Sequence, residues 1–148
     1  MNASMIIRPF TPHDIQHIVR LANRYASFDS DVTEADFQVD GTFPNGLLVA
    51  EDGHTIVGFV FGYIREVPAA VLDRWHASKV AQIELLAVDS SSRGQGVGRL
   101  LLDRLLDALR DEGVDMVLLY CPVEAETALY LYQKAGFEVR AYAMRMRL

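Results

Sequence analysis

Three glycines within five residues separate an apolar run, residues 82–88, from a stretch with leucines at helical spacing, residues 97–109. This order is typical of a buried strand, a turn and an amphipathic helix. The turn reads Arg93-Gly94-Gln95-Gly96-Val97-Gly98. Because glycine has no side chain, the backbone N–H groups of such a turn can converge on one point at a helix N-terminus. The sequence therefore predicts a pyrophosphate site, to which Arg93 and Arg99 would add full positive charges.

Two common phosphate-binding motifs do not fit this turn. A P-loop needs lysine and then serine or threonine after its last glycine, whereas Gly98 is followed by Arg99 and Leu100, which offer no hydroxyl to magnesium. A dinucleotide fingerprint has the spacing G-x-G-x-x-G early in the chain, and the glycines at 94, 96 and 98 are spaced differently and lie late. Both readings are excluded.

The turn resembles the Arg/Gln-x-x-Gly-x-Gly/Ala motif of the GCN5-related N-acetyltransferases (GNAT family), which residues 93–98 match in full. Two further segments resemble the same family. Leu86-Ala87-Val88-Asp89 is similar to the end of the family's fourth strand, and residues 128–137, ALYLYQKAGF, are similar to its later A-x-x-L-Y-x-K-x-G-F signature. Motifs in the right order are more specific than one alone, and the resemblance covers nearly the whole chain.

The resemblance implies an α/β fold with a mixed, mostly antiparallel central sheet flanked by helices. It implies an enzyme that transfers acetyl from acetyl-CoA to a primary amine, in a small molecule or a protein, by direct attack in a ternary complex. In this family the fourth and fifth strands splay apart, and the coenzyme uses the free edge as a pseudo-strand. The implied coenzyme-binding residues are Leu86, Ala87 and Val88 for the pantetheine arm, with an oxyanion donor near Val88, and Arg93, Gly94, Gln95, Gly96, Val97, Gly98 and Arg99 for the pyrophosphate.

Two residues are candidates for the proton transfers. Tyr132 matches the family's tyrosine, whose hydroxyl can protonate the departing thiolate, and its neighbour Tyr130 cannot share its helix face. Glu84 is the candidate base, because an acid in an otherwise apolar strand needs a reason. Strand alternation predicts that its carboxylate lies on the face of Leu86 and Val88 and borders the cleft, where it would take a proton from the ammonium directly or through water. The alternative is an acid at a strand end, held by a neighbouring cation.

The chain departs from the family pattern at two positions. Many members carry asparagine where this chain has Ala125, and that side chain binds pantetheine, so one coenzyme contact is missing or replaced. Relatives that acetylate ribosomal protein amino-termini carry glutamate where Tyr120 stands, which weakens the case for that acceptor. Two alternatives therefore stay open: a catalytically silent CoA-binding sensor, and an enzyme with a longer acyl donor.

Composition narrows the remaining classes. At 148 residues we expect one domain, residues 1–148. A single cysteine and no signal-like amino terminus lead us to expect a cytoplasmic protein, and no apolar run is long enough to span a membrane. A net charge of −6 argues against nucleic acid and mildly favours a cationic acceptor. The four histidines have no further ligands beside them, so we expect no metal.

The hydrophobic pattern predicts the element order. Strands are expected at 5–10, 47–51, 55–64, 114–121 and 137–146 besides the central one, and helices at 12–27, 33–37 and 124–135 besides the central one. Residues 28–45 are expected to form acceptor-binding loops, and residues 66–78 a connection. The last strand has Tyr142, Met144 and Met146 in alternation and could join a homodimer.

Overall fold

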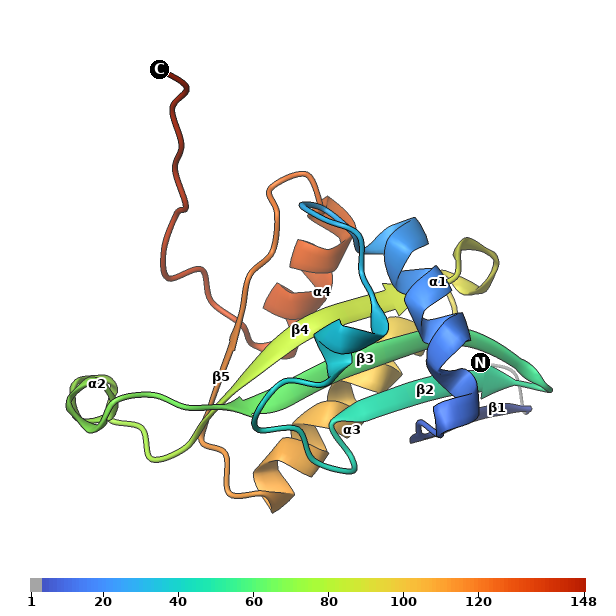
Figure 1. The fold of residues 1–148 in the computed structure, drawn as a ribbon, viewed down its shortest axis with the longest axis horizontal. Coiled ribbons are helices and arrows are strands. Elements are labelled where there is room, and N and C mark those ends of the chain that lie inside the picture. Colours follow the sequence, from blue (N-terminus) through green and yellow to red (C-terminus); the bar gives the residue numbers. More distant parts are fainter. Residues whose placement is uncertain (1–3) are drawn as a thin grey trace.

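The computed structural model describes residues 4–148, in which helices surround a five-stranded sheet (Figure 1). The strands are β1 (Met5–Pro9), β2 (Leu47–Asp52), β3 (Thr55–Arg65), β4 (Val80–Val88) and β5 (Met116–Leu119). The α-helices are α1 (Ile15–Tyr25), α2 (Ala69–Trp75), α3 (Val97–Asp111) and α4 (Glu126–Ala135). Short 3-10 helices cover Pro12–Asp14, Glu34–Phe37 and Ser90–Ser92.

The strands follow one another across the sheet in the order β1-β2-β3-β4-β5. Neighbours from β1 to β4 are antiparallel, and β5 joins β4 in parallel. A parallel neighbour requires a crossover, and α3 supplies it between β4 and β5. The mixed, mostly antiparallel sheet expected from the sequence is confirmed.

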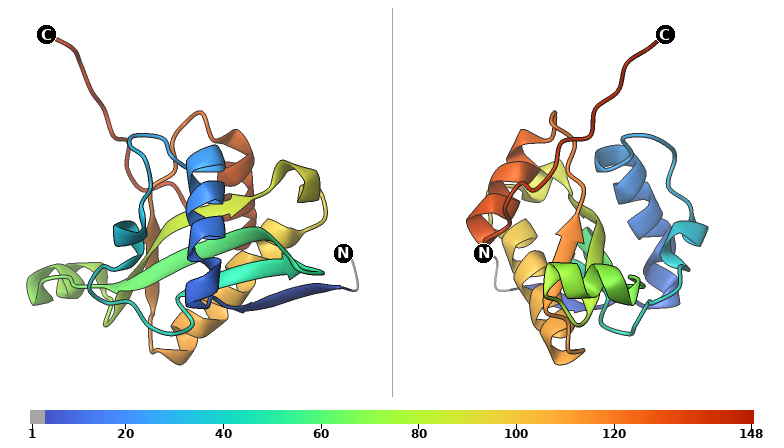
Figure 2. Two further views of the ribbon diagram at one scale, coloured as in Figure 1. Left: turned by 45° about the vertical axis from the view of Figure 1, so that its right-hand side comes forward. Right: turned by 90° about the vertical axis from the view of Figure 1, so that its left-hand side faces the viewer.

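Helices cover both faces of the sheet, with α1 on one side and α3 and α4 on the other (Figure 2). We call these sides the α1 face and the α3 face. Alternation along β3 supplies both, because Phe59 and Phe61 pack with α1 while Val60 packs with α3. The α3 face holds the leucines that the sequence placed at helical spacing, and those fully buried are Leu101, Leu102, Leu105 and Leu109.

A β-bulge interrupts the pairing of β3 with β4. Phe61 lies opposite Leu85, but the next residue, Gly62, lies opposite Ile83. Glu84 is therefore the extra residue, with no partner of its own on β3. A bulge bends the strand and redirects side chains, and it is often found beside functional sites.

The bulge overturns one prediction from the sequence. Ile83 before it, and Leu86 and Val88 after it, all pack on the α3 face, so the alternation of side chains changes parity at the bulge. Glu84 does not share their face, as strand alternation predicted. It lies on the α1 face beside Gln82, whose Nε2 donates a hydrogen bond to the Glu84 carboxylate at 2.9 Å.

The predicted final strand, residues 137–146, is also wrong. This segment continues beyond α4 as an extended tail that projects from the body of the molecule (Figure 1). Its alternating sequence suits a strand, but no strand among residues 4–148 lies alongside it to supply hydrogen bonds. Residues 66–78, expected as a connection, contain α2, which begins after Pro68 and ends at Trp75. His76, which follows it, has a left-handed conformation with φ of 54°.

Other elements differ mainly at their ends. The predicted helix at 12–27 is a 3-10 turn followed by α1, and the predicted helix at 33–37 is a 3-10 helix. The predicted strand at 114–121 is reduced to β5. Its shortening leaves Tyr120 outside the sheet and 74 % exposed.

A buried carboxylate joins the first strand to the first helix. The Arg8 guanidinium donates to both carboxylate oxygens of Asp14, at 2.7 and 3.0 Å, and its Nε donates to Glu51 of β2 at 2.7 Å. The backbone N–H of Thr11 adds a third hydrogen bond to Asp14, at 2.7 Å. These donors, chiefly Arg8, lower the pKa of Asp14 from 3.8 to about 2.

We predict that Asp14→Asn lowers the free energy of unfolding by about 2 kcal/mol at pH 7, because the charged form is the one that the fold stabilises. A depressed pKa in the folded state gives stability that is present above pH 4 and lost as the pH falls towards 2. The deficit of the variant should therefore shrink in urea titrations between pH 4 and pH 2. Asp107→Asn, which removes an exposed ion pair with Arg110, should change little at any pH.

Candidate active site

The second half of β4 has a free edge. β5 pairs with β4 only from Val80 to Ile83, where its last residue, Leu119, lies opposite Ile83. From Leu85 to Val88, β4 is paired with β3, whereas on its other side it has no partner from Glu84 onward among the described residues. Unpaired backbone groups of a strand edge bind extended ligands through main-chain hydrogen bonds. The edge includes all three residues expected to hold pantetheine, Leu86, Ala87 and Val88.

The free edge leads into the N-terminus of α3. Gly94 and Gly96 have φ of 77° and 78°, and Gly96 is the N-cap of the helix. Leu100 is the first residue of α3 whose backbone N–H is hydrogen-bonded within the chain, and it donates to the carbonyl oxygen of Gly96 at 3.0 Å. The preceding N–H groups, from Val97 to Arg99, are left for a ligand, and the space beside Gly96 is open. The glycine turn therefore has the geometry of an anion site.

The arginine side chains beside this turn have partners within the chain. Arg93 lies over the ring of Tyr25, with its guanidinium carbon 4.8 Å from the ring centroid, and its Nε donates to the carbonyl oxygen of Val88 at 3.3 Å. Arg99 pairs with Asp103, one turn further along α3, at 3.0 Å. In this conformation the positive charge of the turn comes from backbone N–H groups and the helix dipole first.

Tyr25 is a site residue that sequence reasoning missed. Its hydroxyl lies 3.1 Å from both the hydroxyl and the backbone nitrogen of Ser90. It thus joins the last turn of α1 to the 3-10 helix before the glycines, while its ring carries Arg93. A tyrosine 65 residues away in sequence from Ser90 gives no local signal of this contact.

Tyr132 lies on the buried side of α4, on the α3 face, and is 7 % exposed. No hydrogen bond to its hydroxyl occurs within residues 4–148, yet no fully buried side-chain polar atom there lacks a partner. The hydroxyl must therefore keep some access to solvent. Burial raises the pKa of Tyr132 to about 12, so the phenol is protonated at neutral pH. Tyr130, 63 % exposed, lies on another side of the helix, as the sequence predicted.

Glu84 belongs to a polar group on the α1 face. Its carboxylate is exposed and accepts from Gln82, whose Oε1 in turn accepts from Arg65 at 3.2 Å. Tyr63, on β3, lies close by: burial, and then the charge of Glu84, raise the pKa of the Tyr63 phenol, with a smaller effect of Tyr120. The sequence pointed to Glu84 but not to Tyr63, although Tyr63 continues the alternation of Phe59 and Phe61.

The segment between β5 and α4 carries the other candidates. Ala125 is the N-cap of α4, and its side chain makes no capping hydrogen bond. Cys121 is partly buried, and its Sγ lies 3.8 Å from the carbonyl oxygen of Ala125. Burial, and then the charge of Glu124, raise the pKa of this thiol. Both residues lie on the chain that leads to Tyr132.

Residues 4–148 hold neither a cluster of metal-binding side chains nor a helix that could span a membrane. No three His, Cys, Asp or Glu side chains come together as a metal site would need. No helix in this part of the chain has the length and apolar character needed to cross a membrane.

A strand edge that leads into a helix N-terminus defines a class of α/β domain suited to an extended ligand with an anionic end. Within that class, the sequence model of the acetyltransferase (GNAT) family matches residues 13–137, and the chain belongs to this family. Its sequence is 36% identical over 98 residues to a mycothiol acetyltransferase of Thermobifida fusca, a match that covers 65% of this chain and 29% of the relative. It is 31% identical over 110 residues to a probable N-acetyltransferase family 8 member 5 of Mus musculus, covering 74% and 44%.

Solved structures share the fold of this chain. Ard1 from Thermoplasma volcanium superposes with a TM-score of 0.76 at 28% identity, over 94% of this chain and 86% of that one. Arabidopsis thaliana Naa50, solved with a bisubstrate analogue CoA-Ac-MVNAL, has a TM-score of 0.73 at 18% identity, over 94% and 86%, and shares the fold. The chain spans less than half the length of the two curated relatives named above.

We predict that Gly96→Glu weakens acetyl-CoA binding at least about tenfold, because it places a carboxylate at the expected pyrophosphate site. Isothermal titration calorimetry measures the change. Gly113→Glu is the matched control, since Gly113 has a similar φ of 84° and open space around it but follows the opposite end of α3. Equal affinity in the two variants would contradict the assignment of the anion site.

Proposed function

We propose that this domain is an acetyl-CoA-dependent N-acetyltransferase that acts on a primary amine by direct attack in a ternary complex. The observation that carries the proposal is the free edge of β4 from Glu84 to Val88, continuous with the glycine turn at the N-terminus of α3. Pantetheine would extend along the edge, and the pyrophosphate would lie on the turn between Arg93 and Arg99. The acetyltransferase names of relatives support the same chemistry.

The two proton transfers of the proposed reaction would take place on opposite faces of the sheet. The amine nitrogen attacks the thioester carbon, a C–N bond forms, and the negative charge on the carbonyl oxygen would be stabilised by a backbone N–H near Val88. The C–S bond then breaks, and the thiolate takes a proton from the Tyr132 hydroxyl on the α3 face. On the α1 face, Glu84 would accept the proton of the ammonium, directly or through water.

The acceptor would enter from the α1 face, where Glu84 is exposed beside Tyr63 and Tyr120. A carboxylate and phenols in that position favour a cationic amine over an anionic acceptor. The exposed Tyr120 stands where relatives that acetylate ribosomal protein amino-termini carry glutamate, so we favour small-molecule amines.

Thiol release from acetyl-CoA tests the proposal, with a mixed pool of polyamines, amino acids, aminoglycosides and peptides as acceptors. Amine-dependent release would support it. Tight binding without release for any amine would favour the catalytically silent sensor, for which Ala125 is the one favourable feature. Faster release from a longer acyl-CoA in the same assay would reassign the donor.

We predict that Tyr132→Phe lowers kcat about 10²-fold and leaves the Kd of acetyl-CoA nearly unchanged, because it removes the proton donor but keeps the buried ring. Steady-state kinetics and calorimetry measure the two quantities. Tyr130→Phe makes the same change on the exposed side of α4 and should alter neither. An unchanged kcat in Tyr132→Phe would remove Tyr132 as the acid.

We predict that Glu84→Gln lowers kcat/KM and alters the acidic limb of its pH profile, because the amide cannot accept the ammonium proton. The variant keeps the size of the side chain and its neighbour Gln82. Glu112→Gln, beyond the far end of α3, is the control for loss of one charge. An acidic limb identical to that of the wild type would assign the base to water or to another residue.

A further inference from the structure

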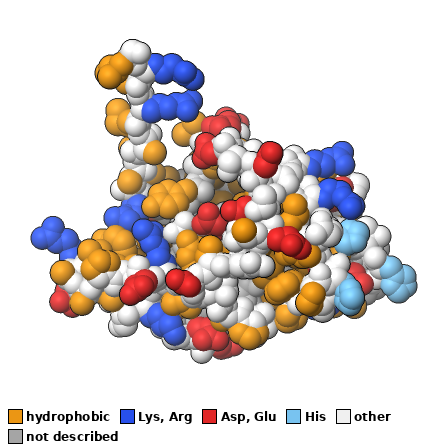
Figure 3. Space-filling model, viewed as in Figure 1, with side chains coloured by type: hydrophobic (Ala, Val, Ile, Leu, Met, Phe, Trp, Pro, Cys, Tyr) orange, Lys and Arg blue, Asp and Glu red, His pale blue; other side chains and the backbone are white. Residues whose placement is uncertain are grey.

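The tail after α4, residues 137–148, has the alternating sequence of a half-buried strand. Its apolar side chains from Tyr142 onward are nevertheless exposed, as expected for a segment that pairs with no other strand. Tyr142, Met144 and Met146 alternate with small or charged residues and are 84 %, 91 % and 80 % exposed. None of residues 141–148 makes a hydrogen bond within the described chain, 4–148. Figure 3 shows the tail standing clear of the body, with apolar and basic side chains along it. Such an apolar face is unfavourable in water unless something covers it.

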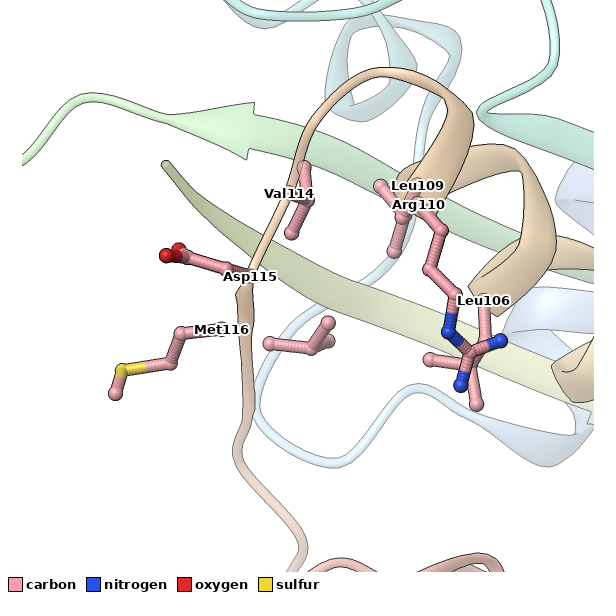
Figure 4. A pocket seen from close by; sticks show the side chains of 7 residues that line it. Leu106, Leu109, Arg110, Val114, Asp115 and Met116 are labelled. Carbon is pink, nitrogen blue, oxygen red and sulfur yellow. The ribbon is translucent and has the colours of Figure 1, made fainter. Parts of the chain in front are cut away.

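The same molecule has a sheet edge without a neighbour. β5 pairs only with β4 among the described strands, so its other edge offers unpaired N–H and C=O groups. Beside this edge, on the α3 face, lies a hollow of about 210 Å³ between β5 and the last turns of α3 (Figure 4). Its apolar lining comes from Leu106, Leu109, Val114, Met116 and Val117. The hollow lies at the opposite end of α3 from the glycine turn.

Charge favours contact between these two parts. The tail, residues 137–148, carries three arginines and one glutamate, whereas residues 1–136 carry 19 carboxylates and 11 lysines or arginines. Along the helix and turn beside the hollow, residues 103–115 carry five carboxylates and two arginines. The charged residues that line the hollow itself are Arg110, which donates a hydrogen bond to Asp107, and Asp115. A strand with methionines on one face and arginines on the other therefore suits an apolar hollow whose surrounding segment carries more carboxylates than arginines.

Two contacts with its own chain hold the first part of the tail, so that the rest of the tail points away from the body of the molecule. Phe137 packs edge-on against Tyr132, with ring centroids 5.8 Å apart, and Arg140 lies over Trp75, 4.9 Å from the ring centroid. Trp75 ends α2, which itself projects from one end of the sheet (Figures 1 and 2). Beyond Arg140 the tail moves away from the body and from its own β5.

We propose that residues 141–148 add as a strand to the β5 edge of a second copy of this chain, in a reciprocal exchange. Two equivalent contacts would close a symmetric dimer and leave neither edge open. Met144 and Met146 would cover the hollow of the other copy, where flexible side chains fit an irregular apolar surface. The proposal does not depend on acetyl transfer, because its tests measure mass and cross-links.

Sedimentation equilibrium or light scattering over a range of concentrations should give the mass of two chains. Met144→Asn should weaken the dimer about tenfold or more, because it removes apolar area from the covered face. Ala143→Asn, which introduces the same polar side chain on the opposite face of the strand, should have a smaller effect. A wild-type protein that is a monomer at all concentrations would overturn the proposal, as would equal effects of the two variants.

Engineered cysteines distinguish a tail that pairs with β5 of a second copy from a tail that folds back onto its own β5. In a Cys121→Ser background, one chain carries Val117→Cys and a second carries Met144→Cys or Met146→Cys. Mild oxidation of the mixture should give a disulfide-linked dimer of the two chains. When both cysteines are placed in one chain, a disulfide within the monomer would show that the tail returns to its own β5 and would overturn the proposal. Absence of any disulfide, with a dimer by mass, would also reject the strand pairing.

Discussion

The structure depends on one property of β4: this strand has a neighbouring strand on both sides along only part of its length. It pairs with β3 on both sides of the bulge at Glu84, but with β5 only up to Ile83, the residue just before the bulge. The loss of a neighbour and the change of side-chain parity thus coincide. One position in the chain frees the backbone edge and turns a carboxylate onto the α1 face.

Helix α3 connects this strand to the rest of the core. Its leucines form the centre of the α3 face, and its N-terminus receives the chain directly after β4. A Cβ at Gly98 would lie 3.4 Å from the side chain of Leu131 and 3.7 Å from that of Val88. These are ordinary van der Waals distances, so α3, α4 and the end of β4 pack directly around Gly98, and burial of the core and the position of the turn are coupled.

The sequence allowed prediction of much of the fold and of the residues around the turn, because periodicity, glycine spacing and capping are local properties. Three features could not be predicted from the sequence. The bulge at Glu84 depends on the register between strands, which alternation within one strand does not reveal. The contact of Tyr25 with Arg93 joins distant segments. The tail was predicted as a strand from its alternation, yet a strand forms only where another lies beside it.

Cys121 adds a point about chemical selectivity. It is the single thiol of the chain, and it lies on the segment that leads to Tyr132, yet burial and Glu124 raise its pKa. Thiolates attack thioesters far more readily than thiols do. A thiol kept protonated beside the proposed reaction centre is a poor competitor for the acetyl group. In the proposed reaction, the incoming amine would therefore have little competition from Cys121 for the acetyl group.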